Sequence, residues 1–162
     1  MSITDEVLSA NKDYAAKFDG GGLAMPPARK LAILACMDAR ISVEKLLGLK
    51  TGDAHIIRNA GGLATDDAIR SLSISQRLLG TEDVVVVMHE GCGLHGASED
   101  EFAEALRADG VLPTWRLGAF ADVDATLRDS LTRLRSSAEL PHRDHVRGFI
   151  FDPEDGSLRE VA

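Results

Sequence analysis

Cysteine is scarce in this sequence, and no long apolar run occurs. Only two of the 162 residues are cysteine, too few for a disulfide framework. No apolar stretch approaches the roughly 20 residues needed to cross a bilayer. The first residues, MSITDEVLSANKDY, lack the basic region and apolar core of a signal peptide. We therefore expect a cytoplasmic protein whose cysteines remain reduced.

Basic residues are also in the minority. The chain has 18 Lys and Arg against 26 Asp and Glu, which gives a formal charge of −8 and a pI near 5.0. Such a surface repels nucleic acids and anionic membranes, so neither is expected as the main partner. The apolar share of 44% and the length fit one globular domain with a substantial core.

A glycine- and proline-rich segment separates the start of the chain from the rest. Gly20 to Gly22 and the Pro26–Pro27 pair interrupt any regular element. Before them, apolar residues recur at helical spacing; they are Ile3, Val7, Leu8, Tyr14 and Phe18. We expect an N-terminal helix there, and a helix on such a linker can reach a neighbouring subunit.

From residue 30 onward, apolar strands alternate with helices. The strands are expected at 30–36, 53–59, 83–89 and 145–152, with a short edge strand at 156–161. The helices are expected at 42–49, 65–80, 98–110 and 122–137, with Ser42, Thr65 and a Ser98–Glu101 capping box at three of their starts. Continuous Val, Ile and Leu runs are typical of parallel strands covered on both faces. The fold class is therefore α/β, with a mainly parallel sheet of about four strands plus an edge strand.

Both cysteines follow predicted strands. Cys36 ends the first strand, and His89 and Cys92 stand at the end of the third. Carboxyl ends of parallel strands meet at one edge of the sheet, where open α/β folds place their sites. Two thiolates and one imidazole suit zinc, and three protein ligands leave a fourth position free, as in catalytic sites. The alternative is that each cysteine only fills core volume.

Asp38 and Arg40 lie within four positions of Cys36. An arginine at hydrogen-bond distance keeps a carboxylate ionised and oriented. Asp38 could then accept a hydrogen bond from zinc-bound water and orient the resulting hydroxide toward a substrate. Asp38 and the remaining histidines are also the candidates for a fourth ligand. The simpler interpretation is a surface ion pair in a loop.

These segments resemble the β-class carbonic anhydrases, in particular their small bacterial and archaeal branch. CMDAR matches the family's C-x-D-x-R motif, HEGC matches its H-x-x-C motif, and HIIRNAGG resembles the segment between them. The resemblance implies reversible hydration of CO₂ to bicarbonate at one Zn²⁺ per subunit. It places Cys36, His89 and Cys92 on the metal and Asp38 with Arg40 in a catalytic dyad.

The resemblance also implies an organisation for the whole chain. Residues 1–162 form a single β-carbonic anhydrase-like domain, with a helical arm and linker at 1–29 and an α/β core at 30–162. The arm packs on a partner subunit in a homodimer or higher homo-oligomer. In some members the aspartate leaves the arginine and occupies the fourth position on zinc at lower pH, and this sequence carries both residues. We expect the open form at alkaline pH.

Several residues near the motifs allow two interpretations. Gly61, Gly62 and Gly93 either bring main chain close to the pocket or serve as ordinary turn glycines. Glu90 and Gly91 replace the Thr and the Asp or Gly of many relatives, so the Glu90 carboxylate either alters the water network or points to solvent. His95 is a candidate proton shuttle or an exposed loop residue, and no histidine besides His89 is assigned a catalytic duty.

Two other functions remain open at this stage. The same family fold hosts hydrolases of carbonyl sulfide and carbon disulfide, which use the same zinc site. A different class is a zinc-binding or redox-sensing protein without turnover. The Asp38–Arg40 pair distinguishes these classes, because a purely structural zinc site has no use for it.

Overall fold

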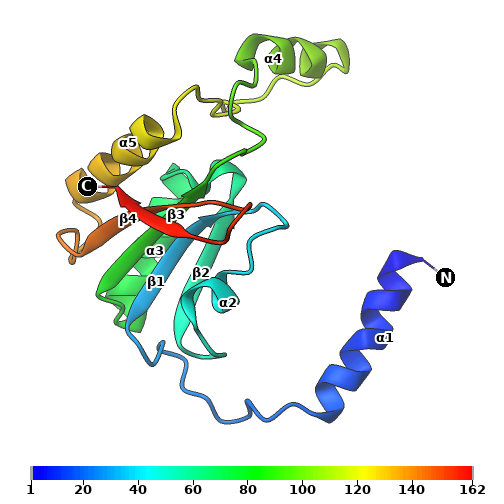
Figure 1. The fold of residues 1–162 in the computed structure, drawn as a ribbon, viewed down its shortest axis with the longest axis vertical. Helices are drawn as coiled ribbons and strands as arrows, with labels where there is room; N and C mark the ends of the chain where they lie inside the picture. The colour runs from blue at the N-terminus through cyan, green and yellow to red at the C-terminus, as the bar shows by residue number, and fades with distance from the viewer. Residues whose placement is uncertain (1, 162) are drawn as a thin grey trace.

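The computed structural model describes residues 2–161, which form one five-stranded sheet with helices around it (Figure 1). The strands are β1 (Leu31–Cys36), β2 (Ala54–Asn59), β3 (Asp83–His89), β4 (Val146–Phe151) and β5 (Leu158–Val161). The helices are α1 (Ile3–Ala16), α2 (Val43–Leu47), α3 (Asp66–Leu79), α4 (Glu99–Ala108) and α5 (Val123–Ser136), and a 3-10 turn, η1 (Ala60–Gly62), follows β2. The expected alternation of strands and helices is confirmed.

The strand order is β2-β1-β3-β4-β5. The first four strands are parallel and β5 is a short edge strand, as the sequence predicts. Strand β5 pairs antiparallel with β4, a direction that the sequence does not indicate. Strands β1 and β3 are neighbours inside the sheet, and their carboxyl ends lie at the same edge. This topology brings the segment that begins at Cys36 close to the segment that begins at His89.

Each face of the sheet has its own hydrophobic core. Alternate residues of β1 point to opposite faces, so Leu34 joins the core under α3 and α5, while Ile33 joins the core that contains Val43 of α2. Residues 32–36 of β1 are all buried. Cys36 and Cys92 belong to the second core, so the candidate metal ligands rest on packed side chains.

The helix starts are confirmed in part. Thr65 accepts a hydrogen bond from the N–H of Ala68 at the start of α3, and Ser98 accepts one from the N–H of Glu101 at the start of α4. Within residues 2–161 the return bond of the predicted Ser98–Glu101 capping box is not formed. Ser42 occupies the N-cap position of α2 but its side chain accepts no hydrogen bond, because this five-residue helix is anchored instead by burial of Val43.

Two helices stand away from the sheet. Figure 1 shows α1 and α4 as arms that project from the core, and neither helix contains a buried residue. No helix in residues 2–161 combines the length and the hydropathy that a membrane crossing requires. Both helices expose apolar side chains, among them Ile3 and Val7 on α1 and Phe102 on α4.

Candidate metal centre

The carboxyl ends of β1 and β3 bring three metal-ligating side chains together. Cys36 ends β1, His89 ends β3, and Cys92 lies in the turn that follows. Their ligand atoms all lie within 4.8 Å of one another, and each residue is at least nine-tenths buried. The Cys36 Sγ and His89 Nε2 atoms are 3.2 Å apart. The three residues that the sequence selects from distant segments therefore converge.

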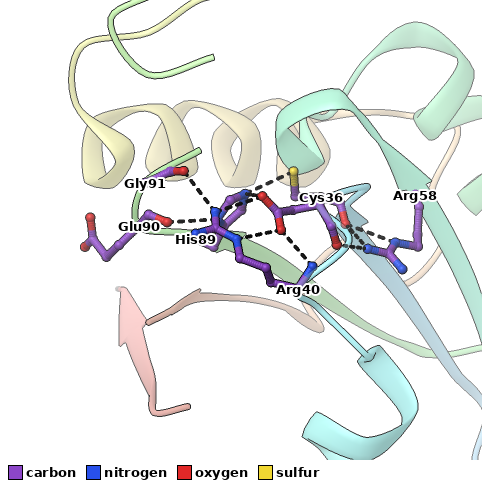
Figure 2. A network of polar contacts seen from close by, with 7 residues as sticks. Cys36, Arg40, Arg58, His89, Glu90 and Gly91 are labelled. Atoms are coloured by element: carbon purple, nitrogen blue, oxygen red, sulfur yellow. Dashed lines mark hydrogen bonds and ion pairs between the residues drawn. The ribbon is translucent and has the colours of Figure 1, made fainter. Parts of the chain in front are cut away.

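The ring of His89 is oriented by its own neighbour. Its Nδ1 lies 2.8 Å from the carbonyl oxygen of Glu90, where it donates a hydrogen bond (Figure 2). This bond fixes the tautomer in which Nε2 keeps a free lone pair on the side of the sulfurs. Two sulfurs and one imidazole nitrogen, buried and converging, fit zinc by softness and by number.

The two thiols differ in their surroundings. Burial raises the pKa of Cys36, but a hydrogen bond with His89 and backbone N–H groups of Asp38 and Gly61 outweigh it, so the net pKa is lowered. Burial is also the main influence on Cys92 and raises its pKa. The hydrogen bond with Cys36 raises the pKa of His89. Since metal ligands must be deprotonated, zinc affinity decreases as the pH falls.

Asp38 and Arg40 form a close ion pair beside the metal centre. Arg40 Nε and Nη2 donate to Oδ1 and Oδ2 of Asp38, both at 2.9 Å, and the N–H of Arg40 also donates to Oδ1 at 2.9 Å. These hydrogen bonds hold the pKa of the Asp38 carboxyl well below its usual range. Asp38 Oδ2 lies 3.7 Å from His89 Nε2, so the carboxylate faces the metal centre while it remains paired with Arg40.

Arg40 also connects the two segments that carry the ligands. Its Nη2 donates to the carbonyl oxygen of Gly91 at 3.0 Å, between His89 and Cys92 (Figure 2). Gly91 adopts a φ of 61°, which glycine tolerates best. The arginine that holds Asp38 therefore also fixes the turn that presents Cys92.

Gly62 lies where the chain after β2 passes close to the main chain of Cys36. Its φ is 67°, and a Cβ placed on it would lie 2.9 Å from both the Cys36 nitrogen and the Val87 oxygen. Gly61 also has a positive φ, of 78°. Gly93 has neither feature, since no atom lies within 4 Å of an added Cβ and its φ is not positive. Of the three glycines selected from sequence, the geometry therefore requires glycine only at the first two positions.

We expect Gly62→Ala to lower the free energy of unfolding by on the order of 3 kcal/mol. The cost combines a left-handed backbone with a clash against two main-chain atoms that cannot move aside. Urea unfolding at a fixed protein concentration measures the change. Gly93→Ala is the matched control and should unfold with the parent protein. Equal midpoints for both variants would contradict this explanation of Gly62.

The Glu90 carboxylate forms an ion pair within the fold. Its Oε1 accepts a hydrogen bond from Nη2 of Arg159 on β5 at 3.1 Å. Arg159 in turn donates to both carboxylate oxygens of Asp124, at 2.8 Å and 2.6 Å, in the first turn of α5. This ion network links the residue after His89 to the edge strand and to α5. The ion pair is neither of the two interpretations of Glu90 that the sequence offered.

We expect Arg159→Gln to lower the free energy of unfolding at pH 7 by about 1 kcal/mol or less, as for other half-exposed ion pairs. Arg159 lowers the pKa of Asp124, so its contribution is present above the ordinary carboxyl pKa of about 4 and is lost as the pH falls through the lowered value. The gap between parent and variant should therefore close below about pH 4. Thermal unfolding across pH measures it, with Arg70→Gln as the exposed ion-pair control. A gap that persists unchanged to pH 2 would refute the assignment.

The side chains of His95 and His55 make their contacts away from the metal centre. His95 stacks on Phe120 with ring centroids 6.0 Å apart, and its Nε2 lies 2.9 Å from the carbonyl oxygen of Ala121. His55 bonds to Ser75 within the fold. None of these contacts joins them to the metal centre. The sequence did not single out Arg58, although its guanidinium reaches the main chain of Cys36 and Asp38.

Comparisons with known proteins find carbonic anhydrases similar to this chain. A family model described as carbonic anhydrase matches residues 31–146. The protein named β-carbonic anhydrase 1 of Mycobacterium tuberculosis is 45% identical and aligns over 100% of this chain and 99% of its own length. The crystal structure of carbonic anhydrase from Streptococcus mutans matches with a TM-score of 0.92 and 38% identity, covering 100% of this chain and 99% of that one.

A second group of relatives is named carbon disulfide hydrolase. A carbon disulfide hydrolase of Acidithiobacillus thiooxidans is 36% identical over 85% of this chain and 79% of its own length. Another, from an Acidianus strain, is 42% identical over 97% of this chain and 73% of its own length. These hydrolases contain more sequence outside the match than the mycobacterial protein does.

Proposed function

This chain belongs to the β-carbonic anhydrase family, and from that premise we propose how its own residues carry out the reversible hydration of CO₂ to bicarbonate and a proton. The observation that carries the proposal is the convergence of Cys36, His89 and Cys92 with an ionised carboxylate, Asp38, directed at the same point. A closed structural site would not need that carboxylate.

Members of this family use zinc, and we assign one Zn²⁺ per subunit to the Cys36, His89 and Cys92 side chains. When bound, zinc acts as a Lewis acid that makes a hydroxide nucleophile available near neutral pH. The protein holds the ligands in place through β1 and β3, and the hydrogen bond from His89 Nδ1 to Glu90 keeps the imidazole in the binding tautomer.

Asp38 and Arg40 are assigned the catalytic dyad. Asp38 stays ionised through the working pH range because Arg40 holds its pKa low, so its carboxylate acts only as a hydrogen-bond acceptor. It accepts a hydrogen bond from the attacking solvent oxygen and thereby directs a lone pair of that oxygen toward the carbon of CO₂. Arg40 keeps the carboxylate aimed through the bidentate pair, and we propose this paired arrangement as the open form at alkaline pH.

The main-chain segment of η1 forms a further part of the proposed site. Gly62 brings backbone close to Cys36, and the N–H of Gly61 lowers the pKa of the Cys36 thiol. Gly93 is part of the turn after Cys92. We propose that these glycines shape the pocket as main chain, without side-chain chemistry.

The decisive experiment is stopped-flow CO₂ hydration by the purified protein, together with its zinc content. Zinc-loaded protein should accelerate hydration, chelator should abolish the acceleration, and added Zn²⁺ should restore it. Zinc-loaded protein that fails to hydrate CO₂ at any pH from 6 to 9 would instead favour the non-catalytic zinc-binding or redox-sensing alternative.

A second candidate substrate is carbon disulfide or carbonyl sulfide, which are also linear and triatomic. The observation that favours it is the group of carbon disulfide hydrolases among the relatives. Release of hydrogen sulfide from either compound, measured beside CO₂ hydration on one preparation, distinguishes the substrates. We expect CO₂ to be preferred, because the mycobacterial carbonic anhydrase matches almost end to end.

We also propose that α1 packs on a second copy of this chain in a homodimer or higher homo-oligomer. Ile3, Val7 and Tyr14 fall on one side of α1 and are exposed, at 72%, 63% and 58%, and Phe18, just past its end, is 49% exposed. Tyr14 and Phe18 lie with ring centroids 5.5 Å apart. A stripe of this kind on a helix without buried residues calls for a partner surface. Residues 1–29 are the arm and linker of one domain that spans residues 1–162, in a protein we place in the cytoplasm.

We expect Val7→Asp to shift the protein to a smaller assembly at micromolar concentration. A charge in the apolar stripe of α1 would be desolvated on packing against the partner. Sedimentation velocity measures the assembly size. The control is Ser9→Asp, which places the same charge on the opposite side of α1. A common sedimentation coefficient for parent, Val7→Asp and Ser9→Asp would exclude α1 from the interface.

A further inference from the structure

Arg58, the penultimate residue of β2, bonds to main chain at the metal centre. Its Nε and Nη2 donate to the carbonyl oxygen of Cys36 at 3.0 Å and 2.8 Å, and Nη2 also donates to the carbonyl oxygen of Asp38 at 2.7 Å (Figure 2). In the described part of the chain, Arg58 takes part in no ion pair with a carboxylate. The hydrogen bonds of its side chain all go to the segment with a metal ligand and the proposed catalytic carboxylate.

The hydrogen bonds of Arg58 lie just beyond the end of the β1–β2 ladder. The β1–β2 ladder ends with Cys36 opposite Asn59 and with the N–H of Met37 donating to the Asn59 carbonyl at 2.9 Å. Beyond it the chain leaves the sheet and turns, with the N–H of Ile41 donating to the Asp38 carbonyl at 3.1 Å. Within residues 2–161 the β1–β2 ladder does not extend to this turn. Arg58 reaches past the end of the ladder and bonds to the main chain there.

We propose that Arg58 is a positioning residue for the reaction. It fixes the main chain from Cys36 to Asp38, so that the Cys36 sulfur is presented to zinc and the Asp38 carboxylate is directed at the attacking oxygen. Arg40 donates hydrogen bonds to the Asp38 carboxylate, whereas Arg58 donates one to the main-chain carbonyl of the same residue. Figure 2 shows the two guanidinium groups on opposite sides of the segment that begins at Cys36. The inference rests on the proposed function, and Arg58 touches no reacting atom.

The chemistry of this position requires arginine. The planar fork directs two N–H groups at one carbonyl and leaves a third contact for the next, which a single ammonium group cannot reproduce. Bonds from a charged donor are also stronger than bonds between neutral groups. Lysine at position 58 would therefore keep the charge but lose the geometry.

The test compares Arg58→Gln and Arg58→Lys with the parent full-length protein. Three measurements are made: kcat and KM for CO₂ hydration, the rate of zinc transfer to excess chelator, and the visible absorption spectrum of the Co²⁺-substituted protein, which reports ligand geometry. Both variants should lower kcat about 10-fold or more with little change in KM, and should release zinc about 10-fold faster. The cobalt bands should shift, because the Cys36 sulfur is no longer held.

Arg147→Gln is the matched control. Arg147 lies on β4, is exposed, and donates through Nε and Nη2 to the Glu160 carboxylate, both at 2.6 Å, away from the metal centre. Its loss should leave kcat, zinc release and the cobalt spectrum unchanged. A general effect of removing a surface arginine would appear in this control as well.

Specific outcomes would overturn the proposal. Parent-like values of kcat, zinc release and cobalt spectrum in Arg58→Gln would exclude a positioning role. A fully active Arg58→Lys with a parent spectrum would show that charge alone suffices, which also contradicts it. If Arg58→Gln does not fold, Arg58→Lys decides the matter. If zinc-loaded parent protein does not hydrate CO₂, the proposed function fails, while zinc release and the cobalt spectrum still test Arg58.

Discussion

Cys92→Ala is expected to reduce bound zinc from one ion per chain to almost none and to abolish CO₂ hydration. Cys92 supplies one of only three protein ligands, and its ligand atom lies within 4.8 Å of those of Cys36 and His89. The two remaining donors cannot complete a catalytic zinc site, which holds three protein ligands. Elemental analysis after growth with ample zinc measures the loss, and stopped-flow hydration measures the activity.

Two further variants support this experiment. Cys92→Ser keeps the volume of the side chain but replaces the thiolate by a poor zinc ligand, so it should lose zinc like the alanine variant. Arg147→Gln, which lies outside the site, should retain zinc in full. One zinc per chain in Cys92→Ala would remove this residue from the metal centre.

Asp38→Asn is expected to keep zinc and lose most of the hydration activity, by about 100-fold or more. The amide has the shape of the carboxylate but offers one acceptor oxygen and no charge. An asparagine paired with Arg40 therefore cannot also accept the hydrogen bond from the attacking oxygen. Zinc remains because Asp38 is not among the three ligands. Zinc content and kcat measured on one preparation separate the two effects.

The control for this variant is a second aspartate–arginine pair. Asp67→Asn breaks the exposed contact with Arg70 on α3, where the two groups are 2.9 Å apart. It tests whether loss of a surface ion pair alone lowers activity, and we expect no change. Full activity in Asp38→Asn would exclude Asp38 from the mechanism and leave its pairing with Arg40 as a purely structural contact.

The sequence predicts the frame of this protein well, for a simple physical reason. Strands buried on both faces are continuous apolar runs, and the change from apolar to polar residues marks where β1 and β3 end. The parallel topology then places Cys36 and His89 at the same edge of the sheet, and the observed order, with β1 beside β3, makes them neighbours. The spacing of Asp38 and Arg40 likewise predicts their pairing, because residues so close in a turn have few other partners.

Other features depend on contacts that leave no pattern in the sequence. Arg58 bonds to carbonyl oxygens 20 and 22 residues earlier in the chain, and every residue offers a carbonyl, so nothing in its neighbours identifies the target. The pairing of Glu90 with Arg159 spans 69 residues for the same reason. Helical periodicity describes only the helix itself, so it does not predict that α1 and α4 stand away from the sheet.

The placement of Cys36 and His89 on two adjacent interior strands has a consequence for how the site fills. Both donors stand on a hydrogen-bonded ladder whose side chains are almost fully buried, so their separation is set before an ion arrives. Only Cys92 sits in a turn. Because Arg40 holds that turn, all three donors would already be in place, and none would have to move into position after the ion arrives.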